Sequence, residues 1–429
     1  MKWTIGKAER GLRGEIAPPP DKSISHRAVM FGSISRGKTR IKNFLFAEDC
    51  MRTFAAFKLM GVDIERKGDS VFITGNGLRG LDLPDKDFYL GNSGTTMRII
   101  SGILAGQNFT SVLTGDESLS IRPMERIIKP LSLMGADIEA VDGHAPLTIR
   151  GKGVFLIPIK YTLPVASAQV KSCILAAGLY SEGKTTVIEP YQSRDHTERM
   201  LEYFSAEIQR NGLISEVKGV KELNSGDIDV PGDISGAAFF IVAALLVKGS
   251  LLVIRNVGIN PTRTGLIDVL KRMGAKIRIL DMSERIEPAA DLEIKYSELK
   301  STVIEEKEIP LLIDEIPVLI IAALMAEGRT VIKGIKELKV KETDRIKTMK
   351  HNLCRMGLDI AEENETLIIE GNSRKIKAAE LESFGDHRIA MSMAVAALIS
   401  DGECVIKNTD CTETSYPGFL GDLKKVRSF

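Results

Sequence analysis

The chain of 429 residues is long enough for two or three domains of ordinary size. Lysine and arginine number 58 against 57 aspartate and glutamate residues, so the formal net charge is +1, and 44% of residues are hydrophobic. This balance argues against a protein that coats nucleic acid or a membrane surface. The five cysteines are scattered and form no C-x-x-C pair, which is typical of reduced thiols in the cytosol.

The N-terminal segment has no apolar run that could act as a signal peptide, so we expect a cytoplasmic protein. The longest apolar stretches, near 237–247 and 316–326, are about half of the ~20 residues that a membrane span needs. We therefore expect buried helices there and no membrane partner. The five histidines lie far apart without an H-x-x-x-H pair, which predicts no metal site.

A two-part signature recurs along the chain. Its first part is a small-residue helix, a polar break ending in glycine and a β-branched strand, at 28–41, 176–188, 243–254, 322–332 and 396–406, with a weaker copy at 102–113. Its second part is a helix that ends at glycine and enters a strand, at 59–64, 133–138, 272–277 and 355–360, with a degenerate copy at 203–208. The pattern predicts an α/β protein of six β-α-β-α-β-β units, three in each of two domains.

The sixth unit has little chain left after its small-residue helix and strand. We expect the N-terminal segment to supply its missing strand, which makes one domain discontinuous. The predicted domains are residues 1–19 plus 233–429 and residues 20–232. The proline-rich crossings near 18–20 and 230–233 would then form the hinge.

A polar cluster precedes the small-residue helix of each unit. These clusters are DKSISHR (21–27), GNSGTTMR (91–98), PVASAQVKS (164–172), PGDISGAA (231–238), DEIP (314–317) and GDHRIA (385–390). Each could simply cap its helix. However, Lys22, Arg27, Arg98 and Arg388 oppose the helix dipole at these positions, and cations at a helix N-terminus suit a bound phosphate or carboxylate. If the units of a domain are arranged alike, several helix N-termini face one cleft.

Two further charged segments, VKETDR (340–345) and SRDHTER (193–199), leave two interpretations open. Alternating charges of this kind can lie on a solvated helix face, or they can belong to the anion site. The segment from Gly32 to Thr39 matches the P-loop pattern but must be rejected as one. A P-loop follows a strand and precedes a helix, whereas here the helical stretch comes first.

These clusters together resemble the enolpyruvyl transferase family, and within it the members that act on shikimate 3-phosphate. DKSISHR, GNSGTTMR, IRPMER, SAQVKS, VKETDR, GDHRIAM and SYPGF occur in the family's order along the whole chain. The pair DKS-x-x-HR and VKETDR is highly specific. The resemblance implies a two-domain inside-out α/β barrel of six repeats, with a hinge that closes on substrate.

The resemblance implies a transferase of the shikimate pathway, which leads to chorismate and the aromatic amino acids. The enolpyruvyl (carboxyvinyl) group of phosphoenolpyruvate would pass to the 5-hydroxyl of shikimate 3-phosphate with release of phosphate, without a metal or a cofactor. The phosphoenolpyruvate site would comprise Lys22, Gly94, Arg122, Gln169, Arg345 and Arg388. The shikimate 3-phosphate site would comprise Lys22, Ser23, Arg27, Ser167, Gln169, Ser193, Arg194, Asp314 and Lys341. Arginine forks bind carboxylate and phosphate in two-pronged fashion, so their number suits these substrates.

The resemblance also assigns the proton transfers. Asp314 would take the proton of the 5-hydroxyl, and Glu342 would act as acid and base at the methylene carbon. Lys22 would assist the departing phosphate. A carboxylic acid that protonates carbon near neutral pH needs a raised pKa, and closure that expels water would help to raise it.

Three positions depart from the best-known pattern of the family. Ala168 stands where a hydroxyl is often found, Thr414 where many members have a phosphate-contacting lysine, and Glu337 where asparagine is common. Several motifs resemble the subgroup associated with glyphosate tolerance, although Gly94 is kept where tolerant members can carry alanine. We expect a monomer that glyphosate inhibits in competition with phosphoenolpyruvate, at a strength that the sequence leaves open.

Two other functions compete with this assignment. The enolpyruvyl transferase that acts on UDP-N-acetylglucosamine typically has Lys-Asn where this chain has Lys22-Ser23, and it has a reactive cysteine around 110–120. This chain has no cysteine between Cys50 and Cys173. A noncatalytic module that binds anions or RNA ends would need the basic residues, but it would not need Asp314 together with Glu342.

Overall fold

A computed structural model describes residues 1–371 and 376–427 of the chain. The chain forms two compact units, which we call unit 1 (Met1–Pro19 with Pro231–Phe429) and unit 2 (Pro20–Val230). Each unit contains three repeats of one pattern, in which a strand, an inner helix, a second strand and an outer helix precede a final pair of strands. In the described residues, the third repeat of unit 1 has one strand, β1, in place of the final pair.

Unit 2 contains three such repeats. The first consists of β14 (Ile228–Asp229), α1 (Lys22–Ile34), β3 (Arg36–Lys42), α2 (Glu48–Leu59), β4 (Asp63–Lys67) and β5 (Ser70–Asn76). The second consists of β6 (Phe88–Tyr89), α3 (Gly94–Leu104), β7 (Thr110–Thr114), α4 (Glu117–Ser120), α5 (Glu125–Leu133), β8 (Asp137–Val141) and β9 (His144–Arg150). The third consists of β10 (Lys160–Thr162), α6 (Ala168–Gly178), β11 (Lys184–Ile188), α7 (His196–Tyr203), β12 (Ile208–Asn211) and β13 (Ile214–Lys218).

Unit 1 repeats the pattern with short 3₁₀ helices (η) added. Its first repeat has β2 (Arg13–Ile16), α8 (Ile234–Leu246), β15 (Leu251–Gly258), α9 (Gly265–Arg272), β16 (Lys276–Ser283) and β17 (Ala289–Lys295). The second has β18 (Val303–Ile304), η1 (Glu306–Leu311), α10 (Ile316–Met325), β19 (Arg329–Lys333), η2 (Ile335–Val340), α11 (Arg345–Arg355), β20 (Ala361–Glu363) and β21 (Thr366–Glu370). The third has β22 (Glu380–Glu382), α12 (His387–Ala397), β23 (Cys404–Lys407), η3 (Thr409–Thr414), α13 (Phe419–Arg427) and β1 (Lys2–Ile5).

Every repeat has its own small sheet of the same topology. The first strand pairs parallel with the second, as β10 does with β11, and the second pairs antiparallel with the last, as β11 does with β13. In the sixth repeat the N-terminal strand β1 pairs antiparallel with β23. Strands from distant parts of the chain also open the first repeat of each unit, because β14 pairs with β3 and β2 pairs with β15.

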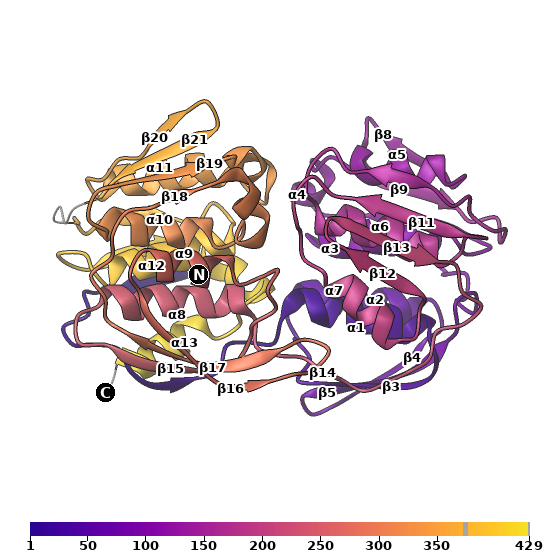
Figure 1. Cartoon of the computed structure of the whole chain (residues 1–429), viewed down its shortest axis with the longest axis horizontal. Helices are drawn as coiled ribbons and strands as arrows, with labels where there is room; N and C mark the ends of the chain where they lie inside the picture. Colours follow the sequence, from indigo (N-terminus) through magenta and orange to yellow (C-terminus); the bar gives the residue numbers. More distant parts are fainter. Residues whose placement is uncertain (372–375, 428–429) are drawn as a thin grey trace. The chain divides into compact units, whose positions relative to one another are not determined.

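The inner helix of each repeat is largely buried, and most of these helices contain several alanine, glycine or serine residues. All residues of α8 from Ile234 to Leu245 are buried, and α8, α10 and α12 contact one another. In unit 2, α3 contacts both α1 and α6. In each unit the inner helices lie inside and the small sheets lie outside (Figure 1). This is the inside-out α/β arrangement that the family resemblance implied, and small side chains on the inner helices allow close packing at the centre.

Glycines end the outer helices as the second signature predicted. Gly61, Gly135, Gly274 and Gly357 have φ values of 77°, 83°, 93° and 75°, which is the left-handed conformation of a helix stop. Ser205 takes the same conformation, with φ of 66°, in the degenerate copy. The rejection of a P-loop is confirmed, because Gly32 lies in helix α1 and Gly37 in the following strand β3, so the helix precedes the strand. Among the described residues, no helix is both long and apolar enough to cross a membrane.

Candidate active site

In unit 1 the candidate residues lie at the starts of three helices. Asp314 precedes α10, Glu342 lies between η2 and α11, and Arg345 is the first residue of α11. Arg388 is the second residue of α12, whose N-cap Asp386 accepts a hydrogen bond from the Arg388 backbone N–H at 2.8 Å. The repeated fold therefore gathers residues that are up to 74 positions apart in the sequence.

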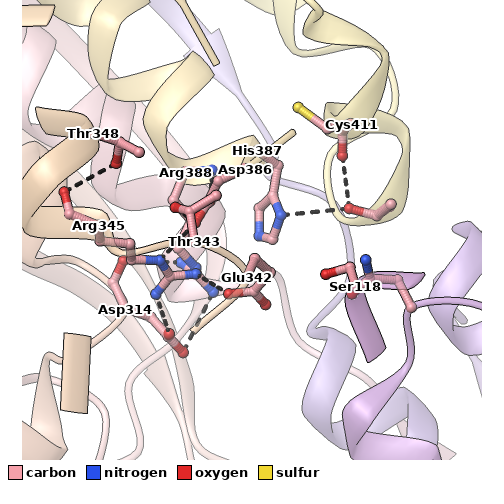
Figure 2. Close-up of polar contacts among 12 residues, drawn as sticks. Ser118, Asp314, Glu342, Thr343, Arg345, Thr348, Asp386, His387, Arg388 and Cys411 are labelled. Carbon is pink, nitrogen blue, oxygen red and sulfur yellow. Dashed lines mark hydrogen bonds and ion pairs between the residues drawn. The ribbon is translucent and has the colours of Figure 1, made fainter. Parts of the chain in front are cut away.

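Arg345 is the centre of this group (Figure 2). Its side chain is only 1% exposed and forms ion pairs with three carboxylates. Nε lies 2.9 Å from Asp386 Oδ2, Nη1 lies 3.0 Å from Asp314 Oδ1 and Nη2 lies 2.6 Å from Glu342 Oε2. The two residues expected to move protons are therefore bound to the same buried cation.

Arg388 binds the other side of Asp314. Its Nη2 lies 3.4 Å from Asp314 Oδ2, and its Nη1 donates to the Asp314 carbonyl at 3.2 Å and lies 3.9 Å from Glu315 Oε1. Glu315, the N-cap of α10, also accepts a hydrogen bond from the Ser235 hydroxyl. Asp314 is thus fixed between two guanidinium groups.

Carboxylates outnumber cations in this part of unit 1. Four carboxylates lie within ion-pair distance of the two guanidinium groups, namely Asp314, Glu315, Glu342 and Asp386. Burial alone would lower the pKa of Arg345, but the charges of Asp386, Glu342 and Asp314 outweigh it and raise that pKa. The side chain of Glu342 is 25% exposed.

In unit 2 the cations of α1 bind polar groups from several elements. Lys22 Nζ lies 2.8 Å from Asp49 Oδ2. The buried Arg27 donates from Nε to Thr197 Oγ1 at 2.7 Å and from Nη2 to Ser172 Oγ at 2.8 Å. Its Nη1 donates to the Ser23 carbonyl at 2.9 Å. Arg27 therefore ties the start of α1 to α6 and α7.

A second group in unit 2 surrounds Gly94, the first residue of α3. Arg98 Nη1 donates to Gln169 Oε1 at 2.7 Å, and Gln169 Nε2 donates to Thr95 Oγ1 at 3.0 Å. Arg122 donates to Asn92 Oδ1. A methyl group at Gly94 would lie 3.0 Å from Arg98 Nη1 and 3.3 Å from Arg122 Nη1, so only glycine leaves both guanidinium groups undisturbed.

The remaining candidates of unit 2 lie beside α6 and α7. Ser167 is the N-cap of α6, with its Oγ accepting from the Val170 N–H at 3.4 Å. Ser193 is buried and donates its hydroxyl to Glu189, and Arg194 follows it directly in the loop before α7. Within each unit, the structure thus places the predicted residues at helix starts or in the loops before them.

The alternatives from the sequence are partly answered by this geometry. The clusters do cap helices, because Asp21, Ser93, Ser167, Asp233 and Asp386 all accept hydrogen bonds from helix N–H groups. The solvated-face interpretation is wrong for Glu198 and Arg345, which are each 1% exposed. Sequence reasoning missed the contacts of Asp386, Asp49 and Glu189. Only Asp386 had a signal, its N-cap position, and that signal did not reveal its contact with Arg345.

The part of the chain that the structure describes has no group of three or more histidine, cysteine, aspartate or glutamate side chains arranged to hold a metal ion.

Known proteins resemble this chain over its full length. The sequence profile of the family described as EPSP synthase (3-phosphoshikimate 1-carboxyvinyltransferase) matches residues 7–423. A 3-phosphoshikimate 1-carboxyvinyltransferase of Geotalea uraniireducens is 52% identical over 427 residues, covering 99% of this chain and 99% of the relative. The enzyme of that name from Bacillus cereus is 50% identical over 426 residues, again covering 99% of each chain.

Solved structures agree with these sequence matches. The EPSP synthase of Acinetobacter baumannii superposes with a TM-score of 0.89 at 46% identity, covering 99% of this chain and 98% of that one. The enolpyruvyl transferase NikO of Streptomyces tendae has a TM-score of 0.80 at 18% identity, covering 99% of this chain and 97% of that one, which indicates a shared fold. The chain therefore belongs to the EPSP synthase family of enolpyruvyl transferases.

Proposed function

We propose that this chain transfers the enolpyruvyl group of phosphoenolpyruvate to the 5-hydroxyl of shikimate 3-phosphate, with Asp314 and Glu342 moving the protons. The observation that carries the assignment of roles is the pairing of both carboxylates with Arg345, at 3.0 Å and 2.6 Å. A shared buried cation fixes the positions of the two groups relative to one another, as two successive proton transfers on one substrate pair require.

The addition step forms the bond between the 5-oxygen and C2 of phosphoenolpyruvate. Asp314 takes the proton of the 5-hydroxyl, and Glu342 donates a proton to the methylene carbon, which becomes a methyl group. In the elimination step the bond from C2 to the phosphate oxygen breaks, and Glu342 takes back a methyl proton as the double bond re-forms. Lys22 stabilises the negative charge of the departing phosphate.

The cations of both units bind the anionic groups of the substrates in this proposal. Each terminal nitrogen of Arg345 carries a second N–H that can bind the carboxylate of phosphoenolpyruvate, and Arg388 lies beside it. Arg122, Gly94 and Gln169 bind phosphoenolpyruvate from unit 2. The groups proposed for shikimate 3-phosphate are Lys22, Ser23, Arg27, Ser167, Gln169, Ser193, Arg194, Asp314 and Lys341.

We also propose that the enzyme is a cytoplasmic monomer and that glyphosate competes with phosphoenolpyruvate. Glyphosate carries a phosphonate and a carboxylate, so the same arginines would bind it. Size-exclusion chromatography tests the monomeric state, and inhibition kinetics at varied phosphoenolpyruvate concentration test the competition by glyphosate.

A phosphate-release assay tests the proposed reaction. We expect phosphate from shikimate 3-phosphate with phosphoenolpyruvate, and none when either substrate is omitted or when UDP-N-acetylglucosamine replaces shikimate 3-phosphate. Phosphate release only with UDP-N-acetylglucosamine would favour the rival transferase. If no phosphate is released with either acceptor, the noncatalytic module is favoured.

A further inference from the structure

A buried charge cluster contacts Ser193, one of the residues proposed to bind the phosphate of shikimate 3-phosphate. It consists of Lys171 on α6, Glu198 on α7 and Glu189 just after β11. Lys171 Nζ lies 2.6 Å from Glu189 Oε2 and 2.8 Å from Glu198 Oε1, and the side chains are 0%, 1% and 1% exposed. One ammonium group is therefore shared by two carboxylates in a buried place, which leaves one negative charge in excess.

This cluster is connected directly to Ser193. The Ser193 hydroxyl donates to Glu189 Oε1, while Glu198 Oε1 accepts from the Ser215 hydroxyl at 3.0 Å. The charged groups that act on Glu189 are Lys171 from α6 and Glu198 from α7, and Ser193 adds its hydroxyl from the loop before α7. The hydrogen bond to Glu189 therefore fixes the direction of the single O–H proton of Ser193.

A bound phosphate would compete for that proton. A hydroxyl has one O–H donor, whereas an ionised carboxylate and a phosphate dianion are both acceptors only. If Ser193 turned its proton toward the phosphate, Glu189 Oε1 would lose that donor while remaining buried, which is costly. If Ser193 kept its present bond, its oxygen would face a phosphate oxygen with no proton between them. One additional proton removes the conflict.

We propose that Glu189 is a positioning residue that couples binding of the shikimate 3-phosphate phosphate group to the uptake of one proton. The inference rests on the proposed function, in which Ser193 binds that phosphate. The proton comes from the solvent and lies on the chain formed by the phosphate, Ser193 and Glu189. Either Glu189 donates to Ser193, which donates to the phosphate, or a phosphate P–OH donates to Ser193, which still donates to Glu189.

The electrostatics of the cluster favour this uptake. Burial raises the pKa of Glu189, and the charge of Glu198 raises it further, so that together they outweigh the opposing effects of Lys171 and Ser193. A phosphate dianion placed beside Ser193 would add a second negative charge and raise the pKa of Glu189 again.

Isothermal titration calorimetry with shikimate 3-phosphate tests the proposal. Titrations near pH 8 in buffers of different ionisation enthalpy give the number of protons taken up, and at this pH the free ligand is almost wholly a dianion because its second pKa is about 6. We expect wild type to take up about one proton more than Glu189→Gln. The amide N–H of the glutamine can donate to Ser193, so this variant needs no proton from solvent. For each unit of pH above 8, the Kd of wild type should increase by a factor up to about ten times that of Glu189→Gln.

Two further variants separate this role from a structural one. Ser193→Ala removes the connection and should lower proton uptake as Glu189→Gln does, while Glu216→Gln, which changes a carboxylate on β13 that pairs with Lys184, should keep the wild-type uptake. Equal uptake by wild type, Glu189→Gln and Ser193→Ala would overturn this inference alone. Failure of wild type to bind shikimate 3-phosphate would overturn the proposed function as well. If Glu189→Gln does not melt cooperatively, the Ser193→Ala titration decides.

Discussion

The two units use the same repeat, yet the buried arginines of unit 1 and Arg27 of unit 2 have partners of different charge. In unit 1, four carboxylates lie within ion-pair distance of Arg345 and Arg388. In unit 2, the buried Arg27 binds the neutral oxygens of Thr197, Ser172 and the Ser23 carbonyl. Neutral oxygens position a guanidinium group without cancelling its charge, whereas carboxylates both position and neutralise it. In the proposed function, this difference suits Arg27 of unit 2 to binding phosphate and the carboxylates around Arg345 of unit 1 to moving protons.

The largest effect should come from the carboxylates of unit 1. Glu342→Gln and Asp314→Asn should each lower kcat by about 100-fold or more, because each removes a proton-transfer group. The Kd for shikimate 3-phosphate should stay within about threefold of wild type, since the groups of unit 2 that we propose to bind its phosphate remain. Steady-state kinetics and calorimetry give the two values.

Two exposed carboxylates of unit 1 serve as matched controls for these variants. Asp359→Asn and Glu370→Gln change side chains that are 75% and 70% exposed, and both variants should keep wild-type kcat. If either Glu342→Gln or Asp314→Asn retains more than a tenth of the wild-type kcat, the proposed assignment of proton transfer to the carboxylates of unit 1 is wrong.

A cation of unit 2 should have the next largest effect, and on binding. Arg27→Ala should raise the Kd for shikimate 3-phosphate about tenfold to 100-fold, because a hydrogen bond to a charged group contributes about 1.5–3 kcal/mol. Arg36→Ala, which removes an exposed arginine from the same unit, is the control. Calorimetric titration measures both. An unchanged Kd in Arg27→Ala would mean that Arg27, with its hydrogen bonds to neutral oxygens, does not bind the phosphate of shikimate 3-phosphate.

Acid should destabilise unit 2 through His26, a buried histidine that unit 2 contains. This fully buried imidazole lies 2.7 Å from the Thr53 hydroxyl, and burial lowers its pKa from 6.5 to about 3, with Lys22 and Arg27 contributing in the same direction against Asp49. Because the folded-state pKa is depressed, the stabilisation by neutral His26 is complete above about pH 6.5 and is lost as the pH falls toward 3. At pH 5 the expected loss from this group is about 2 kcal/mol.

Urea unfolding at pH 7 and pH 5 measures that loss. His26→Gln should reduce the difference in unfolding free energy between the two pH values, whereas His351→Gln, at an exposed histidine of unit 1, should leave it unchanged. The same pH dependence in His26→Gln and wild type would assign the acid sensitivity to other groups.

The smallest effect should come from Gly94→Ala. The added methyl group would lie 3.0 Å from Arg98 Nη1 and 3.3 Å from Arg122 Nη1, so these groups must move by a few tenths of an ångström. The KM for phosphoenolpyruvate should rise by about tenfold, less than the roughly 100-fold that a 1 Å misplacement causes. The KM for shikimate 3-phosphate should not change. Gly6→Ala, at a position with nothing within 4 Å, is the control, and equal KM values in both variants would contradict the proposed place of Gly94.

The fold was predictable because its repeats are visible in the sequence. Small-residue helices followed by glycine and a β-branched strand mark the inner helix and second strand of each repeat. The degenerate copy has a left-handed residue, Ser205, where the other copies have glycine. The first strands were harder to predict. Strands such as β14, with two residues, are too short to show any alternation of side chains.

Only residues that belong to a sequence motif could be predicted as members of the candidate site. The contacts of Arg345 with Asp386, and of Ser193 with Glu189, join residues whose proximity depends on how helices and loops pack. Asp386 shows a helix cap in the sequence, but one of its oxygens caps α12 while the other binds Arg345. Glu189 lies after a strand with no motif around it, so its role could come only from the structure.

The most direct test of the account is the reaction of phosphoenolpyruvate with shikimate 3-phosphate in D₂O, followed by mass spectrometry of the product and by phosphate assay. Addition and elimination pass through a methyl group at the former methylene carbon, so wild type should release phosphate and form an enolpyruvyl ether that carries solvent deuterium. Glu342→Gln should form almost no product. A product that forms without deuterium, or at the wild-type rate in Glu342→Gln, would contradict the assignment of proton transfer to unit 1.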